Sequence, residues 1–338
     1  MFKVYIQTFV YFSVMDLLPT IKKPIEHEIA DFNDYFKSLL KSDVMLMNDA
    51  LSFLGESTGK MMRPILVLLI AKSIGNVNDK THSAAAAVEM LHTASLLHDD
   101  VIDESDKRRG RPSLNTRFNN NVAVLTGDYM FSMALNCTAK TGDIRVIDAI
   151  SIMGRDLPNG EVMQVELQQS GTYSEDNYLK VIYYKTASLF VCCAACAVYT
   201  ADGKQEYVEK FSNYAKFAGL CFQMKDDIFD YYSNDVGKPT GSDMSEGKIT
   251  LPALYVLRTS SNPLLQPIRE KISKGIYLDE KEIETLIEIS KNEGGIEYTN
   301  KQIEHYRKLA IESIPEDIED EYRNALIAYI DYVISREK

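Results

Sequence analysis

The sequence has no tryptophan, only 10 prolines and 17 glycines among 338 residues, and no segment with the strict apolar–polar alternation of a half-buried strand. Proline and glycine interrupt helices, so their scarcity leaves room for long ones. Lysine and arginine total 37 against 49 aspartates and glutamates, which gives a net charge of −12. This deficit argues against nucleic acid as the main partner, and it means that an anionic substrate must be met by local cations.

Long apolar runs and metal-binding cysteine pairs are also lacking. No run reaches the roughly 18 apolar residues of a membrane-spanning helix, since ILVLLIA from Ile65 stops at Lys72. The five cysteines show no paired spacing with histidine, and three lie in the apolar run LFVCCAACAV. We interpret them as small core residues of a protein in the reducing cytoplasm, with a disulfide or zinc site as the alternative.

The N-terminal stretch MFKVYIQTFVYFSVM is apolar and aromatic but has no small-residue cleavage site, so it does not indicate a signal peptide. Its composition differs from that of the sequence beginning at Met15. We predict that residues 1–14 are a dispensable extension, which expression from Met15 would test. Residues 15–338 contain no Pro/Ser/Gly linker and are predicted to form one domain.

Apolar residues recur at spacings of three and four, as on the buried face of a helix. The pattern predicts helices over residues 65–73, 83–98, 122–139, 188–199, 208–232 and 279–291. Turn residues lie between them, at 75–76, 111–112, 119–121, 157–160 and 237–248. The sequence therefore predicts an all-α fold.

Two of these windows end in the same motif, DDxxD, in LLHDDVID and QMKDDIFD. On a helix Asp99 and Asp103 share a face about one turn apart, and so do Asp226 and Asp230. Carboxylates so placed repel each other unless a cation lies between them. A solvated acidic helix end would explain one copy, but two copies at the ends of apolar helices favour a site for Mg²⁺, which prefers oxygen ligands and is commonly shared with substrate phosphates.

Cations follow the first motif and occur in turns elsewhere. Arg108 and Arg109 can grip phosphate oxygens through two hydrogen bonds each, so the site is suited to a diphosphate. Lysine and arginine in other turns exceed the need of one diphosphate and hint at two anionic sites; they are Lys60, Arg63, Lys185, Lys238 and Lys248. The helical stripe beneath Asp99 is mostly small (Ser95, His92, Val88, Ala84), which suits either close helix packing or a groove for a long hydrocarbon tail.

These pieces together resemble the trans-prenyltransferases of the polyprenyl synthetase family. The matching segments, in the family's order, are GKMMRP, EMLHTASLLHDDVIDESDKRRG, LTGDYMF, GEVMQVE, YYKTASLF, CFQMKDDIFDY and GKPTGSDMSEGKITLPAL. The resemblance implies a single large helical bundle around a central active-site cavity, usually in a homodimer. It also implies an enzyme that uses three Mg²⁺ ions to condense isopentenyl diphosphate head-to-tail onto an allylic diphosphate, either farnesyl or geranylgeranyl diphosphate. The product could pass to a membrane, and no transmembrane segment is expected.

The resemblance assigns roles position by position. The metal ligands are Asp99, Asp100, Asp103, Asp226 and Asp230, with Asp227 nearby. Isopentenyl diphosphate is expected at Lys60, Arg63, His92 and Arg109. The allylic diphosphate is expected at Arg108, Lys185, Thr186, Gln223 and Lys238. Asp99, Asp103, Asp226 and Lys185 are the expected catalytic residues. The family commonly has glycine and arginine where this chain has Thr58 and Met61, so the loop is less cationic than usual.

Bulky aromatics four and five residues before the first aspartate give short products in this family. Here those positions are Ser95 and Ala94, which resembles the long-chain enzymes. We therefore predict a product longer than about C20, at about C30 to C50. One helical turn spans about 5.4 Å, so a bulky side chain there would shorten the product by about one isoprene unit. Three alternatives remain: a short-chain synthase, a class I terpene cyclase, and a non-catalytic subunit of another synthase. A cyclase would have a different second metal motif, and a non-catalytic subunit usually loses one of the two.

Overall fold

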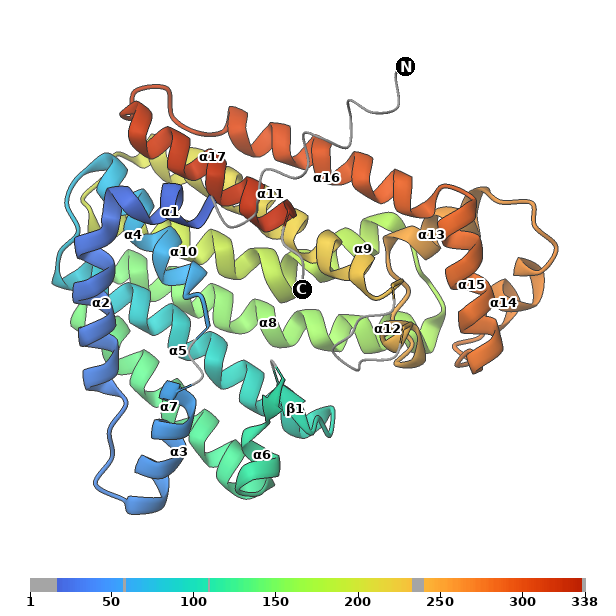
Figure 1. The fold of residues 1–338 in the computed structure, drawn as a ribbon, viewed down its shortest axis with the longest axis horizontal. Helices are drawn as coiled ribbons and strands as arrows, with labels where there is room; N and C mark the ends of the chain where they lie inside the picture. Colours follow the sequence, from blue (N-terminus) through green and yellow to red (C-terminus); the bar gives the residue numbers. More distant parts are fainter. Residues whose placement is uncertain (1–16, 57–58, 109, 233–239, 336–338) are drawn as a thin grey trace. The chain divides into compact units, whose positions relative to one another are not determined.

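The structure is a computed structural model that describes residues 17–56, 59–108, 110–232 and 240–335 (Figure 1). The prediction for residues 1–14 lies outside them. The first elements are α1 (Leu17–Lys22), the 3₁₀ helix η1 (Lys23–Ile25), α2 (Glu26–Leu39), α3 (Met45–Glu56), α4 (Met62–Ile74), α5 (Asp79–Ile102), β1 (Lys107–Arg108), β2 (Arg111–Pro112), α6 (Leu114–Arg117), α7 (Asn120–Lys140) and α8 (Ile144–Ser170). The others are α9 (Glu175–Ile182), the π-helix η2 (Tyr183–Ala187), α10 (Ser188–Thr200), α11 (Gln205–Phe229), α12 (Ser242–Ser245), α13 (Leu251–Thr259), α14 (Leu265–Ser273), α15 (Glu280–Asn292), α16 (Gly295–Glu312) and α17 (Asp320–Ser335). The all-α prediction is confirmed, because the strands β1 and β2 form only a short antiparallel hairpin.

The chain divides into two compact units. The first unit contains the described residues within 1–154, 191–212 and 314–329, and the second unit those within 155–190, 213–313 and 330–338. The first aspartate motif lies in the first unit and the second motif in the second unit.

In the first unit, α5 and α7 lie side by side (Figure 1). The α5 helix begins at a capping box, in which the side chain of Asn78 accepts hydrogen bonds from the backbone N–H groups of Lys80 (2.9 Å) and Thr81 (3.2 Å). Four successive alanines, residues 84–87, are fully buried on α5 and allow close helix packing. The neighbouring α4 is apolar on all sides and buried from Ile65 to Ala71.

In the second unit, α13 packs against α15 and α16, and α9 continues through η2. One stretch, residues 175–200, of which residues 175–190 belong to the second unit and 191–200 to the first, is long and apolar enough by length and composition to span a membrane, although no such stretch was expected from the sequence. Most of it is buried inside the structure, as is typical of a core helix, and it carries Lys185.

The turn predicted at residues 157–160 is wrong, because α8 runs through it with Pro158 inside the helix. A proline in a helix interior costs about 3 kcal/mol, which the rest of this 27-residue helix outweighs. Gly160 has a different reason to be there. A Cβ on Gly160 would lie 2.6 Å from Cγ of Lys185, so only glycine lets α8 approach η2 this closely.

Candidate active site

The first aspartate motif lies at the C-terminal end of α5. The backbone N–H of Asp103 donates to the carbonyl oxygen of Asp99 at 2.8 Å, so the helical turn continues through Asp103 and the two residues are one turn apart. A helix C-terminus carries partial negative charge, and a carboxylate there costs about 0.3–1 kcal/mol. No basic residue lies in the last turn of α5 to offset this. The arrangement lowers the stability of the helix but leaves an electronegative end that suits a cation.

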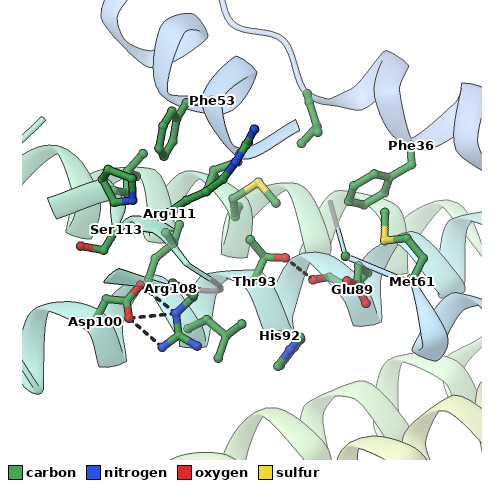
Figure 2. A pocket seen from close by; sticks show the side chains of 18 residues that line it. Phe36, Phe53, Met61, Glu89, His92, Thr93, Asp100, Arg108, Arg111 and Ser113 are labelled. Atoms are coloured by element: carbon green, nitrogen blue, oxygen red, sulfur yellow. Dashed lines mark hydrogen bonds and ion pairs between the residues drawn. The ribbon is translucent and has the colours of Figure 1, made fainter. Parts of the chain in front are cut away.

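Asp100, which follows Asp99 in the first aspartate motif, is buried and forms an ion pair with Arg108 of the hairpin. Nε of Arg108 lies 2.8 Å and 2.9 Å from the two carboxylate oxygens of Asp100, and Nη2 lies 2.6 Å from Oδ1 (Figure 2). This pair fixes the hairpin to the end of α5. The expected roles of Asp100 with metal and of Arg108 with diphosphate stay predictions, while Arg109 lies outside the described residues.

A pocket in the first unit runs along α5 from this ion pair (Figure 2). Its polar lining includes Glu89, His92, Asp100, Arg108 and Arg111. Its apolar lining includes Phe36, Phe53, Leu54, Leu97 and Met130. Ala94 and Ser95 do not line it, so their control of chain length stays a prediction.

The loop before α4 carries the other predicted cations of this unit. Lys60 is exposed and Arg63 is half-buried in the first turn of α4. Met61 between them has φ 53°, in the left-handed region that costs a side chain about 1 kcal/mol or more. The loop therefore holds a strained conformation beside the pocket, which Met61 itself lines. Thr58 lies outside the described residues.

The second aspartate motif ends α11 in the same way as the first ends α5, again with no basic residue in the last turn. Asp227 is buried and accepts hydrogen bonds from Oη of Tyr178 (2.6 Å) and Nε2 of Gln223 (2.8 Å). Burial, together with the nearby carboxylates of Asp243 and Asp226, raises the pKa of Asp227 to about 7. Three carboxylates, those of Asp226, Asp227 and Asp243, therefore lie close enough in this part of the second unit to affect one another's protonation.

Asp230, the last aspartate of this motif, holds the following turn. Its carboxylate accepts from the backbone N–H groups of Ser242 and Asp243, both at 3.1 Å, and from the Ser242 hydroxyl at 2.7 Å. These bonds place Asp243 and Lys248 on the wall of a second pocket, together with Asp227. The expected metal contact of Asp230 stays a prediction, and Lys238 lies outside the described residues.

Lys185 extends from η2 into the second pocket. Its Nζ lies 2.8 Å from the Glu161 carboxylate and 3.0 Å from Oε1 of Gln164, both on α8. One residue further along, the Thr186 hydroxyl donates to Oε1 of Gln223 at 2.7 Å. Single π-helical turns within α-helices are frequent at functional sites, because the extra residue redirects the side chains. The structure therefore places Lys185 and Gln223 on one pocket and the Thr186 hydroxyl against Gln223, while their contact with an allylic diphosphate stays a prediction.

Several residues of these pockets were not singled out from the sequence. Glu161 and Gln164 lie in the segment GEVMQVE, which resembles the family but suggests no role for them. Nothing in the sequence distinguishes Tyr178 or Asp243 from an ordinary tyrosine or aspartate. Their positions depend on helices that are distant in sequence. Only the spacing of Glu161 and Gln164 on one helical face could have marked them.

The donors fit a divalent cation by their chemistry. Within residues 17–56, 59–108, 110–232 and 240–335, no group of three or more His, Cys, Asp or Glu side chains already forms a metal site. Mg²⁺ needs no such cage, because it usually takes one or two carboxylates and completes its shell with water and substrate phosphates. Asp99 with Asp103, and Asp226 beside the crowded Asp227 and Asp243, offer such partial sets.

Comparison with known proteins agrees with this geometry. The profile of the polyprenyl synthetase family matches residues 44–289. The chain belongs to the polyprenyl synthetase family. It is 33% identical to the octaprenyl diphosphate synthase of Haemophilus influenzae over 91% of this chain and 94% of that protein.

Among solved structures, a polyprenyl synthase from Caulobacter crescentus, in complex with calcium and isoprenyl diphosphate, superimposes with a TM-score of 0.85 at 29% identity, covering 96% of this chain and 98% of that one. A geranylgeranyl pyrophosphate synthase from Bacteroides thetaiotaomicron gives 0.81 at 39% identity, covering 95% and 100%. As a member of the polyprenyl synthetase family, this chain is a prenyltransferase, and the family predicted from the sequence motifs is confirmed.

Proposed function

We propose that this polyprenyl synthetase is a Mg²⁺-dependent long-chain synthase. It adds isopentenyl diphosphate head-to-tail to an allylic diphosphate, farnesyl or geranylgeranyl diphosphate, and makes an all-trans polyprenyl diphosphate of about C30 to C50. The observation that carries the reaction is the pair of aspartate motifs, each at the C-terminal end of an apolar helix and each with a cation in its own unit, Arg108 or Lys185.

The residues divide by the ligand that each would hold. Asp99, Asp103 and Asp226 would hold three Mg²⁺ ions, with Asp100 and Asp230 supporting them. The isopentenyl diphosphate would contact Lys60, Arg63, His92 and Arg109. The allylic diphosphate would contact Arg108, Lys185, Thr186, Gln223 and Lys238. Mg²⁺, when bound, supplies the Lewis acid that neutralises a departing diphosphate.

Two observations bear on product length. The octaprenyl diphosphate synthases of Haemophilus influenzae and Escherichia coli support a long product, as do the small residues Ala94 and Ser95. The Bacteroides thetaiotaomicron structure favours a C20 product as the second candidate, because its 39% identity exceeds theirs.

A mass-resolved product assay decides between them. The purified chain is incubated with Mg²⁺, isopentenyl diphosphate and, separately, C10, C15 and C20 allylic diphosphates. We expect a ladder of products that ends at about C30 or beyond, because no aromatic side chain stands at positions 94 and 95. A stop at C20 would establish the second candidate. A cyclic hydrocarbon, or no consumption of isopentenyl diphosphate, would overturn the proposal.

The polyprenyl synthetase is also proposed to act as a homodimer, through the outer face of α7. Val124, Leu125, Phe131 and Leu135 recur at helical spacing on this face and are between 37% and 59% exposed. Apolar side chains gathered on a surface commonly mark a protein interface. The five cysteines are free and buried, which supports a reducing compartment such as the cytoplasm.

Leu135→Glu should convert the dimer into a monomer, because it buries a charge in the apolar contact. Size-exclusion chromatography with light scattering measures the mass. Asn324→Glu is the control, since Asn324 is exposed on α17. A wild-type chain that is already a monomer, or a Leu135→Glu variant that stays dimeric, would refute this interface.

A further inference from the structure

A buried hydrogen-bonded chain connects the second aspartate motif to two other helical segments of the second unit. Oη of Tyr178, on α9, donates to Oδ2 of Asp227 at 2.6 Å. Nε2 of Gln223 donates to Oδ1 of the same carboxylate at 2.8 Å, and Oε1 of Gln223 accepts from the hydroxyl of Thr186 at 2.7 Å. The side chains of Tyr178 and Asp227 are only 6% and 3% exposed, so water cannot replace these bonds freely.

The direction of every bond in this chain follows when Asp227 is ionised. The Thr186 hydroxyl occupies the oxygen of the Gln223 amide, so the amide nitrogen must face Asp227. Each oxygen of Asp227 then has one donor, and neither donor is charged. Tyr178 holds the end of the chain opposite to Thr186.

We propose that Tyr178 is a positioning residue for the prenyl-transfer site. It touches the carboxylate of Asp227 and, through Asp227 and Gln223, sets the hydroxyl of Thr186. This inference rests on the proposed function, which places Gln223 and Thr186 on the allylic diphosphate and Asp226 on the metal. None of the sequence motifs assigned a role to Tyr178.

Asp227 needs the hydrogen bond from Tyr178 because several carboxylates surround the second pocket. Asp227 and Asp243 both line it, and Asp226 precedes Asp227 on α11. A carboxylate that lies beside other carboxylates is repelled by them and rotates away unless hydrogen-bond donors hold it. Without the Tyr178 hydroxyl, Oδ2 of Asp227 loses its donor in a buried place, and Gln223 is no longer confined to one orientation.

The test is Tyr178→Phe, which removes only the hydroxyl. Binding of Mn²⁺ with inorganic diphosphate is measured by calorimetry and by the loss of the free Mn²⁺ signal in electron paramagnetic resonance, without turnover. Tyr178 holds Asp227, which adjoins the proposed metal ligand Asp226 on α11, and loss of such an outer partner typically costs 10–100-fold in affinity or activity, so we expect Mn²⁺ binding to weaken about 10-fold or more. The KM for the allylic diphosphate should rise, whereas the KM for isopentenyl diphosphate stays near the wild-type value.

Tyr298→Phe is the matched control, because Oη of Tyr298 also donates to a carboxylate, that of Glu175, at 2.6 Å in the same unit. This variant should lose similar stability but keep its Mn²⁺ affinity. If both variants bind Mn²⁺ with diphosphate like the wild type, Tyr178 is only structural and the inference is wrong.

Should Tyr178→Phe fail to fold, Tyr178→His, which keeps a shorter ring donor, tests the same bond by an intermediate affinity. A wild-type chain that consumes no isopentenyl diphosphate would refute the proposed function. The comparison of Mn²⁺ affinities would then still test the positioning role of Tyr178.

Discussion

Asp99→Ala should lower the rate of prenyl transfer by at least about 1,000-fold, equivalent to about 4 kcal/mol of transition-state stabilisation. Asp99 and Asp103 are the paired carboxylates of the first motif, and a Mg²⁺ ion shared with diphosphate takes only one or two carboxylates, so the loss of Asp99 removes a large part of its protein ligands. Asp100 cannot take over the role without giving up Arg108, whose guanidinium engages both of its oxygens. The measurement is single-turnover incorporation of labelled isopentenyl diphosphate at saturating Mg²⁺.

The same substitution should leave the fold intact or make it slightly more stable. Asp99 lies in the last turn of α5, where negative charge costs about 0.3–1 kcal/mol, and alanine has the highest helix propensity. Thermal unfolding without Mg²⁺ tests this. Asp176→Ala, in the first turn of α9, is the control and should keep full activity with equal or lower stability. An Asp99→Ala enzyme that turns over within 10-fold of the wild type would show that the first motif does not hold the metal.

The sequence predicted the central helices well because their periodicity is strong. The windows 83–98 and 122–139 correspond to α5 and α7, and the structure extends each by a few residues to caps at Asn78 and Asn119. The turn at 157–160 failed for an equally physical reason. Proline and glycine commonly mark turns, whereas here Gly160 is needed for close contact with Lys185, and the helix tolerates Pro158.

The relative positions of site residues could be predicted from the sequence only where the residues lie on one helix. Asp99 with Asp103 on α5 is such a case, because helical geometry alone puts them one turn apart. The anchoring of Asp230 to Ser242, and of Asp227 to Tyr178, depends on which helices pack together, and no local spacing encodes that. The pairing of Arg108 with Asp100 is intermediate, since the hairpin that returns Arg108 to α5 is short and local.

Ser95→Phe should shorten the longest product by at least one isoprene unit, to about C20 or less if the ring closes the path completely. Ser95 is half-buried on α5, one turn before Asp99, and Val88 and Ala84 on the same stripe are fully buried and smaller than an aromatic ring. Its hydroxyl donates to the carbonyl oxygen of His92 within the same helix, at 2.9 Å, so among the described residues its replacement breaks a bond inside α5. Ala94 is the poorer target, because it is 2% exposed and an added ring there would overpack the core by about 1–3 kcal/mol.

The product distribution is read by mass spectrometry after incubation with farnesyl diphosphate and excess isopentenyl diphosphate. Ser52→Phe, on an exposed position of α3, is the matched control and should give the wild-type ladder. A shorter ladder at an unchanged rate of the first condensation would place Ser95 on the path of the growing chain, because only later additions need the space. An unchanged ladder in a folded Ser95→Phe enzyme would mean that the tail does not follow this stripe of α5, and the small residues at positions 84–87 would then serve helix packing alone.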